Sequence, residues 1–453
     1  MAMEHGQGGG AMAHSDHGHH DAHGHHGPRT MPTVLTAPEA VLVWQKRAMI
    51  VTAVFAVISV VFAFTAEGRQ HLLRSYLMGV MTCFNFVGGA LAFLLVQYLS
   101  GGKWGAILRR PLEAMTRTFG LVVVMMLPVM FRMKELYQWA RWTDPQQTWQ
   151  AYKAGLMTQE EMLMANSKHA MLNPISAIIQ TVVVFAFMGL VISLANKWSL
   201  QRDADPSGGT SASYNKWRVR FENLAGPSTL IYVILMTDFV IVWVKSLDIE
   251  WSSSVYGAQF LVAQGYAVLA LGILTLILLS KYEPIKTMFR TTEQHDLGKL
   301  AFAFTMLNIY LTFAEFLIIY SGNVPDEAEW YIHRIHGGWW VVLSLDVICH
   351  WVVPFCILLS RDFKRSRSKM IWLCAWMIGA RFIDMFWLIE PNFKDAQGNL
   401  HLAANTGILS YVTMPIAVVA CWMYFYLGQL AKRPLIAIND PDTEELLEPE
   451  HAH

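Results

Sequence analysis

Four ionisable residues stand inside two apolar segments in the last quarter of the chain. Asp346 and His350 lie in the first segment, and Arg381 and Asp384 lie in the second. Residues three or four apart share a face of a helix, so each pair should project together. An ionisable group at the centre of a bilayer costs about 2.5 to 3.5 kcal/mol even on an insertion scale, and such groups usually mark a proton, ion or cofactor path. The two pairs therefore predict an internal polar route through a membrane protein.

Two further acids stand in apolar surroundings with no in-span cation near them in sequence, Asp238 and Glu315. Carboxyl and imidazole groups can relay protons when water fills the gaps between them. A purely structural interpretation competes with this one: Arg381 and Asp384 can be a compensated ion pair that fixes two helices together. The candidate proton-path residues are Asp238, Glu315, Asp346, His350, Arg381 and Asp384.

The elements that carry these residues are membrane spans. The chain is 54% hydrophobic and only 15% charged. A run of about 20 apolar residues crosses a bilayer, and ten candidates occur, which predicts an all-α integral membrane protein. The third candidate is the weakest, because its apolar part is short and contains Pro128. The ten ranges are 48–66, 76–99, 112–131, 171–195, 228–247, 255–280, 297–320, 338–359, 370–390 and 405–428.

The distribution of basic residues predicts the orientation. With ten spans, 22 of the 34 Lys and Arg residues fall on the side of the two termini and 10 on the opposite side. The positive-inside rule then places both termini in the cytoplasm. The formal net charge is zero, so no nucleic-acid partner is expected.

Three regions follow from this organisation. Residues 1–47 should be a disordered cytoplasmic tail, residues 48–430 a ten-helix membrane domain, and residues 431–453 an acidic cytoplasmic tail. The first tail is rich in histidine and glycine, and imidazoles at this density can bind Zn, Ni or Cu weakly. We favour an adventitious or buffering tail over a specific metal site for His17, His19, His20, His23, His25 and His26.

The five cysteines argue against a redox centre held by this chain. All of them fall inside expected spans, and none forms a C-x-x-C motif, which disfavours c-type haem attachment and an iron–sulfur cluster. Ligation of a b-type haem by two histidines needs two in-membrane histidines, and only His350 lies well within a span. We therefore expect no covalently bound cofactor.

Two loops on the expected outer side have the composition of docking surfaces. Residues 132–170 are long, rich in Trp and Tyr, and contain a capping box from Thr158 to Glu161 that predicts a short helix. Residues 321–337 bring acids together with aromatic residues of the kind that anchor interfaces.

Several stretches resemble a known family. They read HDLGKLAFAFTMLNIYLTFAEFLIIYSGNVPDEAEWYIHRIHGGWW (295–340), PFCILLSRDFKRS (354–366), RFIDMFWLIEP (381–391) and TDFVIVWVKSLDIEWSSSVYGAQF (237–260). They resemble the F subunits of bacterial alternative complex III, a quinol:cytochrome c oxidoreductase. Those subunits belong to the polysulfide-reductase membrane-subunit (NrfD-like) family. The resemblance covers roughly residues 40–430 and is most specific in the second half.

The resemblance implies a fold and a set of partners. It implies two four-helix bundles flanked by extra helices, in a multi-pass protein of the bacterial inner (cytoplasmic) membrane. Haems and iron–sulfur clusters would belong to neighbouring subunits: the homologous C subunit, the iron–sulfur B subunit and multihaem c-type cytochromes, with a terminal oxidase as a further partner. This subunit would contribute a quinone site, for menaquinone or ubiquinone, or a proton path.

Two other classes of function stay open. A secondary or divalent-metal transporter is suggested by the His-rich tail and by the i, i+4 spacing of Asp346 and His350. Against it, no second pair at matching spacing and no inverted repeat with broken helices is visible. A structural scaffold, whose charges only hold helices together, is the third class.

Overall fold

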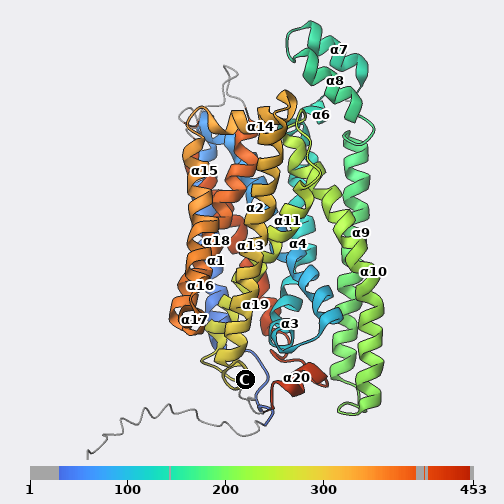
Figure 1. Ribbon diagram of the computed structural model, residues 1–453, viewed down its shortest axis with the longest axis vertical. Helices are drawn as coiled ribbons and strands as arrows, with labels where there is room; N and C mark the ends of the chain where they lie inside the picture. Colours follow the sequence, from blue (N-terminus) through green and yellow to red (C-terminus); the bar gives the residue numbers. More distant parts are fainter. Residues whose placement is uncertain (1–29, 142–143, 394–401, 403–406, 449–453) are drawn as a thin grey trace, which may run out of the picture.

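The computed structural model describes residues 30–141, 144–393, 402 and 407–448. Within these residues the chain forms helices and no strand, which confirms the expected all-α membrane fold (Figure 1). Residues 1–29, which include the six candidate histidines, lie outside the described residues. The rest of the expected tail is described, and α1 begins within it at Glu39, nine residues before the expected boundary.

Among the described residues, nine helical spans are each long and apolar enough to cross a membrane. Six are single α-helices of 24 or more residues, two are α-helices extended by a short 3₁₀ turn, and one is built from three consecutive pieces. The spans are α1 (Glu39–Ala63), α2 (Ala66–Ser100), α9 (Pro174–Asp203), α10 (Ser211–Trp243) with η1 (Lys245–Leu247), α11 (Tyr256–Leu279), α13 (Thr291–Gly322), α15 (Trp340–Asp346) continued by η2 (Val347–Val352) and α16 (Val353–Leu359), α18 (Arg367–Ile389) with η3 (Glu390–Asn392), and α19 (Ile408–Ala431).

The weak third span is a bent pair of helices, α3 (Lys103–Thr116) and α4 (Phe119–Phe131), which meet at 41°. The break does not fall at Pro128. It falls beside Thr118, whose hydroxyl donates to the Met115 carbonyl at 2.6 Å and accepts from Trp422 Nε1 at 2.7 Å. A threonine hydroxyl that bonds the preceding turn competes with the helical backbone pattern.

Both ends of the described chain lie at the same end of the bundle. The Leu435 amide donates to the Leu35 carbonyl at 2.8 Å, so the segments before α1 and after α19 are in contact. An even number of crossings is required for this, and the bent pair therefore counts as one span, giving ten among the described residues.

Short helices decorate the two ends of the bundle (Figure 1). At the end opposite the C-terminus, α7 and α8 project beyond the spans and share a small apolar core of Ala151, Met157 and Met162. The capping box from Thr158 to Glu161 is confirmed at the start of α8. The short helices are α5 (Met133–Leu136), α6 (Gln138–Arg141), α7 (Pro145–Lys153), α8 (Gln159–Lys168), α12 (Ile285–Met288), α14 (Pro325–Ile335), α17 (Arg361–Arg365) and α20 (Pro441–Glu445).

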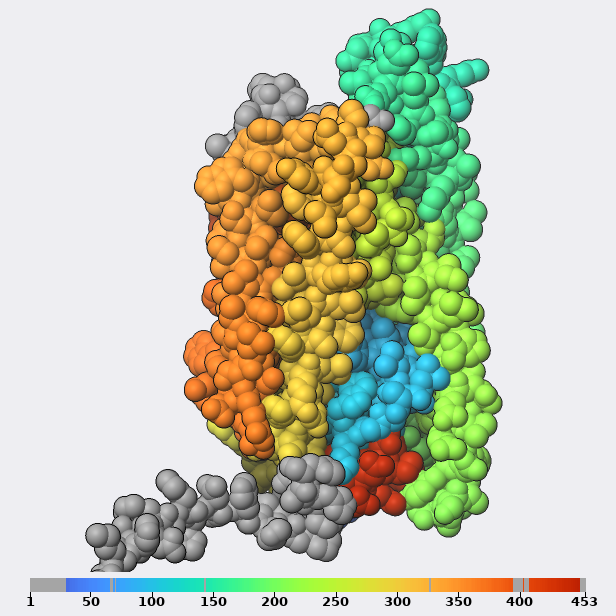
Figure 2. Space-filling model, viewed as in Figure 1, coloured from blue at the N-terminus to red at the C-terminus, as the bar shows by residue number. Residues whose placement is uncertain are grey.

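Two helices form the centre of the bundle, α2 and α11. Most residues along their apolar windows are buried, whereas α1 is nearly all exposed to the surroundings, as expected for a helix that faces lipid. Helix α2 packs against α3, α10 and α19, and α11 packs against α13 and α18. In the space-filling view, α3 is visible between α13 and α10, with α20 beneath it (Figure 2). The helices α11, α13, α15–α16 and α18 thus surround the two ionisable pairs.

Candidate functional site

A polar cavity of about 70 Å³ lies among α11, α13, α14, α15 and α18. Four of the six candidate residues line it: Glu315, Asp346, Arg381 and Asp384. Helix α14 lies across this end of the bundle (Figure 1), and contributes Trp330 and Tyr331 to the lining. A volume of this size holds a few water molecules when polar groups surround it.

Helix α18 supplies the cation of the site. Arg381 is only 1% exposed, and its Nη1 forms an ion pair with Asp384, three residues further along the same face. Its guanidinium carbon also lies 5.6 Å from the centre of the Phe260 ring on α11. Among the described residues, Nε and Nη2 of Arg381 have no hydrogen-bond partner. The guanidinium therefore keeps donors available to water in the cavity.

The second pair, Asp346 and His350, sits where the eighth span changes its helical pitch. Residues Val347–Val352 form a π-helical turn, a feature that is often found at functional sites. Pro354 has no N–H to donate to the carbonyl of residue 350. That carbonyl instead accepts from the Tyr266 hydroxyl at 3.2 Å.

The geometry of this turn brings the imidazole close to the carboxyl group. His350 Nδ1 lies 3.8 Å from Asp346 Oδ1, and both side chains are almost fully buried. This separation is too long for a direct hydrogen bond and suits a bridge through one water. Within the described part of the chain neither ring nitrogen of His350 has a hydrogen-bond partner.

Glu315 closes the opposite side of the cavity, on α13. Its carboxylate accepts from Gln259 Nε2 at 2.7 Å and from the Ser253 hydroxyl. About two turns away on the same helix, the Asn308 amide oxygen accepts from Trp351 Nε1 at 2.8 Å. These hydrogen bonds fix the Glu315 carboxyl group and the Asn308 amide in the cavity wall. Glu315 is the one acid that α13 contributes to the described lining.

The charges that line the cavity do not balance. Its described lining contains three carboxyl groups, Glu315, Asp346 and Asp384, and a single basic side chain, Arg381. If all three carboxyl groups were ionised, the cavity would hold an excess of two negative charges in a medium where unpaired charge is costly. Neutrality requires bound protons or a bound cation. The arrangement is therefore suited to taking up and passing on positive charge.

A cation can also be considered from the donor set. Ligand atoms of Asp346, His350 and Asp384 all lie within 4.8 Å of one another. Carboxylate and imidazole groups are ligands of divalent transition metals. The Arg381 guanidinium, already paired with Asp384, would compete with a metal for the same oxygen atoms.

Helix α14 is held over the cavity by Arg334, which is 1% exposed. Its guanidinium lies 3.7 Å from the centre of the Trp330 ring, and Nη2 donates to Asn392 Oδ1 at 2.5 Å. Burial lowers the pKa of Arg334 to about 10, so the side chain stays charged at neutral pH. Trp330 in turn stacks on Trp251 at 4.5 Å. Helix α14 is therefore fixed over the cavity by packing and hydrogen bonds.

Asp238 does not join this cavity. It lies on α10, is half-buried, and makes no hydrogen bond or ion pair with another described residue. Helix α10 packs against α2, α9 and α11, and none of its residues lines the cavity. Reasoning from sequence missed Tyr266, Gln259 and Ser253. The first two were detectable as polar side chains inside the apolar run of α11.

A scan against protein-family models gives no match to this chain, and a search of curated proteins gives none either.

Proposed function

We propose that this chain is a membrane subunit without redox centres of its own in a respiratory quinol:cytochrome c oxidoreductase of the alternative complex III type, and that it provides a proton path. The carrying observation is the buried cavity with three carboxyl groups and one guanidinium. Support also comes from the position of the resembling stretches. Residues 295–340 and 381–391 supply α13, α14 and the part of α18 that line this cavity.

The chemistry of the proposal uses only this chain's side chains. A proton enters the cavity on water and is held by a carboxyl group, Glu315 or Asp346. The Asp346 and His350 pair passes it through a bridging water, since the two groups lie 3.8 Å apart. Arg381, which pairs with Asp384, is the fixed positive charge of the site.

A quinone does not fit this cavity in the present conformation. An apolar cavity of about 150 Å³ binds a benzene ring, whereas this cavity measures about 70 Å³. We therefore assign no quinone chemistry to it. Menaquinol or ubiquinol would be oxidised in a neighbouring subunit, with haems and iron–sulfur clusters held by the C, B and cytochrome partners in a bacterial inner membrane.

A second function is favoured by one observation: Asp346, His350 and Asp384 bring three possible metal ligands together. In that case the protein is a divalent-cation transporter. Purification in mild detergent separates the two proposals. A respiratory subunit should elute with c-type haem absorbance from its partners, whereas a transporter should elute alone and colourless. Elution without haem in a strain that makes such cytochromes would overturn the first proposal.

A further inference from the structure

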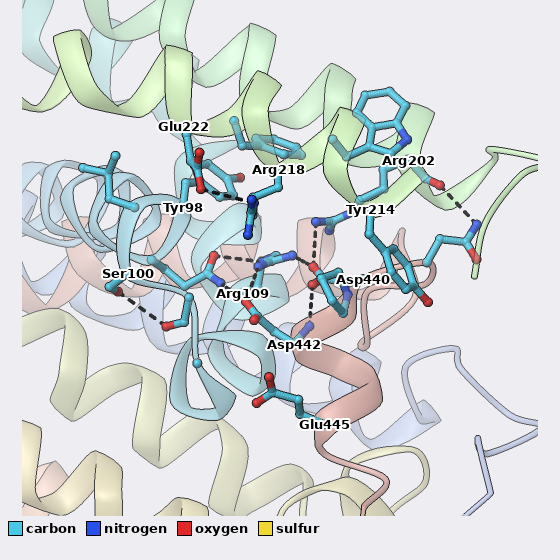
Figure 3. Close-up of a pocket in the computed structure, with 18 residues that line it drawn as sticks. Tyr98, Ser100, Arg109, Arg202, Tyr214, Arg218, Glu222, Asp440, Asp442 and Glu445 are labelled. Atoms are coloured by element: carbon cyan, nitrogen blue, oxygen red, sulfur yellow. Dashed lines mark hydrogen bonds and ion pairs between the residues drawn. The ribbon is translucent and has the colours of Figure 1, made fainter. Parts of the chain in front are cut away.

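A second cavity, of about 370 Å³ (Figure 3), lies beside α20, at the other end of the bundle from α14 (Figure 1). Its walls come from the end of α2, the start of α10 and the segment that leads into α20. It is distinct from the candidate proton site, with which it shares no lining residue. It lies on the side where the distribution of basic residues places the cytoplasm.

Two buried arginines converge at the base of this cavity. Arg109 forms an ion pair with Asp440, and Arg202 Nη1 lies 2.6 Å from Asp440 Oδ2 (Figure 3). Asp440 therefore bridges both guanidinium groups. Arg109 is also fixed by Gln97, whose Oε1 accepts from Nε at 3.1 Å. This ion network anchors the C-terminal segment to the membrane domain.

The network leaves strong donors unused. Arg202 is 4% exposed, yet its Nε and Nη2 have no hydrogen-bond partner among the described residues. Tyr98, 7% exposed, likewise has a hydroxyl group without a partner in this part of the chain. Both side chains line the cavity. Buried donors are normally satisfied, so these two indicate a missing acceptor such as a phosphate.

The cavity lies at the level of lipid headgroups. Helix α10 has 33 residues, which at 1.5 Å per residue is about 50 Å, whereas the hydrocarbon core is about 30 Å thick. The excess falls at its start, where residues 211–222 (SASYNKWRVRFE) are mostly polar, so these turns, with Arg218 and Glu222, extend beyond the hydrocarbon. Apolar side chains next to the cavity face outward, with Leu99 47% and Val219 45% exposed. Acyl chains can lie along this surface below a headgroup in the cavity.

The charge of the lining selects among headgroups. It contains three arginines and four acidic residues, a formal excess of one negative charge. An anionic lipid would add to that excess. A headgroup with both a phosphodiester and an ammonium group adds none. Its ammonium can bind the acids at the mouth, among which Glu222 is 41% exposed and has one oxygen 3.6 Å from Arg218 Nε, a long and exposed ion pair that leaves its other oxygen open to a ligand.

We propose that this cavity binds one phospholipid of the zwitterionic, primary-ammonium class, such as phosphatidylethanolamine. The phosphodiester accepts from Arg202 and Tyr98. The ammonium donates to Glu222 and to the other acids at the mouth. The bound lipid would tie α2 and α10 to the C-terminal segment.

Native mass spectrometry of the purified, delipidated protein tests the proposal, with phosphatidylethanolamine, phosphatidylglycerol and inorganic phosphate added in separate experiments. We expect one phosphatidylethanolamine to be retained per chain. Tyr98→Phe keeps the ring but removes a hydrogen bond to a charged group, and should weaken retention about tenfold. Glu222→Gln should weaken it about threefold, as expected for a partly exposed charge pair.

The control is Tyr426→Phe, which also removes a buried hydroxyl but one that already bonds Thr275 at 3.1 Å, away from the cavity. It should leave lipid retention unchanged. Retention of phosphatidylglycerol at equal or greater strength would overturn the assignment to a zwitterionic lipid. Binding of inorganic phosphate without lipid would indicate a free-phosphate site. Equal retention by Tyr98→Phe and the parent protein would exclude this cavity as the binding site.

Discussion

Arg381 is the residue whose removal should most disturb the candidate proton site. Arg381→Met leaves Asp384 buried without its partner, and Asp346 also loses the nearby positive charge. Breaking a buried ion pair by removing one partner costs about 3 to 5 kcal/mol. We expect a loss of this size in the free energy of unfolding, measured by circular dichroism as the protein is unfolded with a denaturing detergent in mixed micelles.

The chain offers a matched control for this substitution. Arg132 and Glu135 form another i, i+3 ion pair, at 2.5 Å, but their side chains are 53% and 51% exposed. Exposed pairs contribute about 0.2 to 1 kcal/mol, so Arg132→Met should cost little. Equal losses in the two variants would refute the argument that burial makes the Arg381 pair costly to break.

A double variant separates stability from function. Replacing both partners of a buried ion pair by apolar residues is often neutral or stabilising, so Arg381→Met with Asp384→Leu should recover most of the lost stability. It should not recover proton translocation, because the fixed charge and the counter-ion are both gone. Normal translocation in this stable double variant would reduce the pair to a structural element.

Three other outcomes are expected. Tyr266→Phe removes the donor to the His350 carbonyl and should cost about 1 to 3 kcal/mol of unfolding free energy; adding Pro354→Ala, which restores a backbone N–H, should recover part of it, and no recovery would contradict the role given to Pro354. Lys168 donates to the carbonyls of Ile249, Glu250 and Trp251, and burial lowers its pKa from the ordinary value of 10.5. Between the lowered pKa and 10.5 the unfolded chain therefore binds more protons at this residue than the folded chain does. The contribution of Lys168 to the free energy of unfolding should increase as the pH rises through this range. Thermal unfolding of Lys168→Met should show a smaller rise there, and an unchanged rise would assign the effect to other groups. Deletion of residues 1–27 should leave quinol oxidation by the purified complex unchanged, and a large loss of turnover would show a role for the His-rich tail.

The number and positions of the spans were predictable because hydropathy reports directly on transfer into a bilayer. The bend between α3 and α4 was not predicted, because a threonine inside an apolar run does not reveal that its hydroxyl bonds the preceding turn and accepts from Trp422 on another helix. Pro128, which looked like the weak point in the sequence, lies inside a continuous helix. Pro128 thus drew attention to the span that is broken, but the break lies at Thr118 and not at the proline.

The candidate site was predictable only within each helix. Helical spacing put Asp346 beside His350 and Arg381 beside Asp384, and both pairs are close in the structure. The same reasoning could not exclude Asp238, because nothing in its own helix tells which neighbours α10 packs against. It also could not find the pairing of Asp440 with Arg109, residues more than 300 positions apart, because sequence spacing carries no information on such contacts.

The most direct test of the proposed function is the number of protons translocated per electron by the complex carrying Asp384→Asn, reconstituted in liposomes. The substitution preserves shape, and Arg381 keeps the nearby charge of Asp346, so the loss of stability should be smaller than in Arg381→Met and the complex should assemble. We expect normal assembly with clearly fewer protons moved per electron. A proton yield equal to that of the parent complex, with normal assembly, would contradict the assignment of a proton path to this cavity.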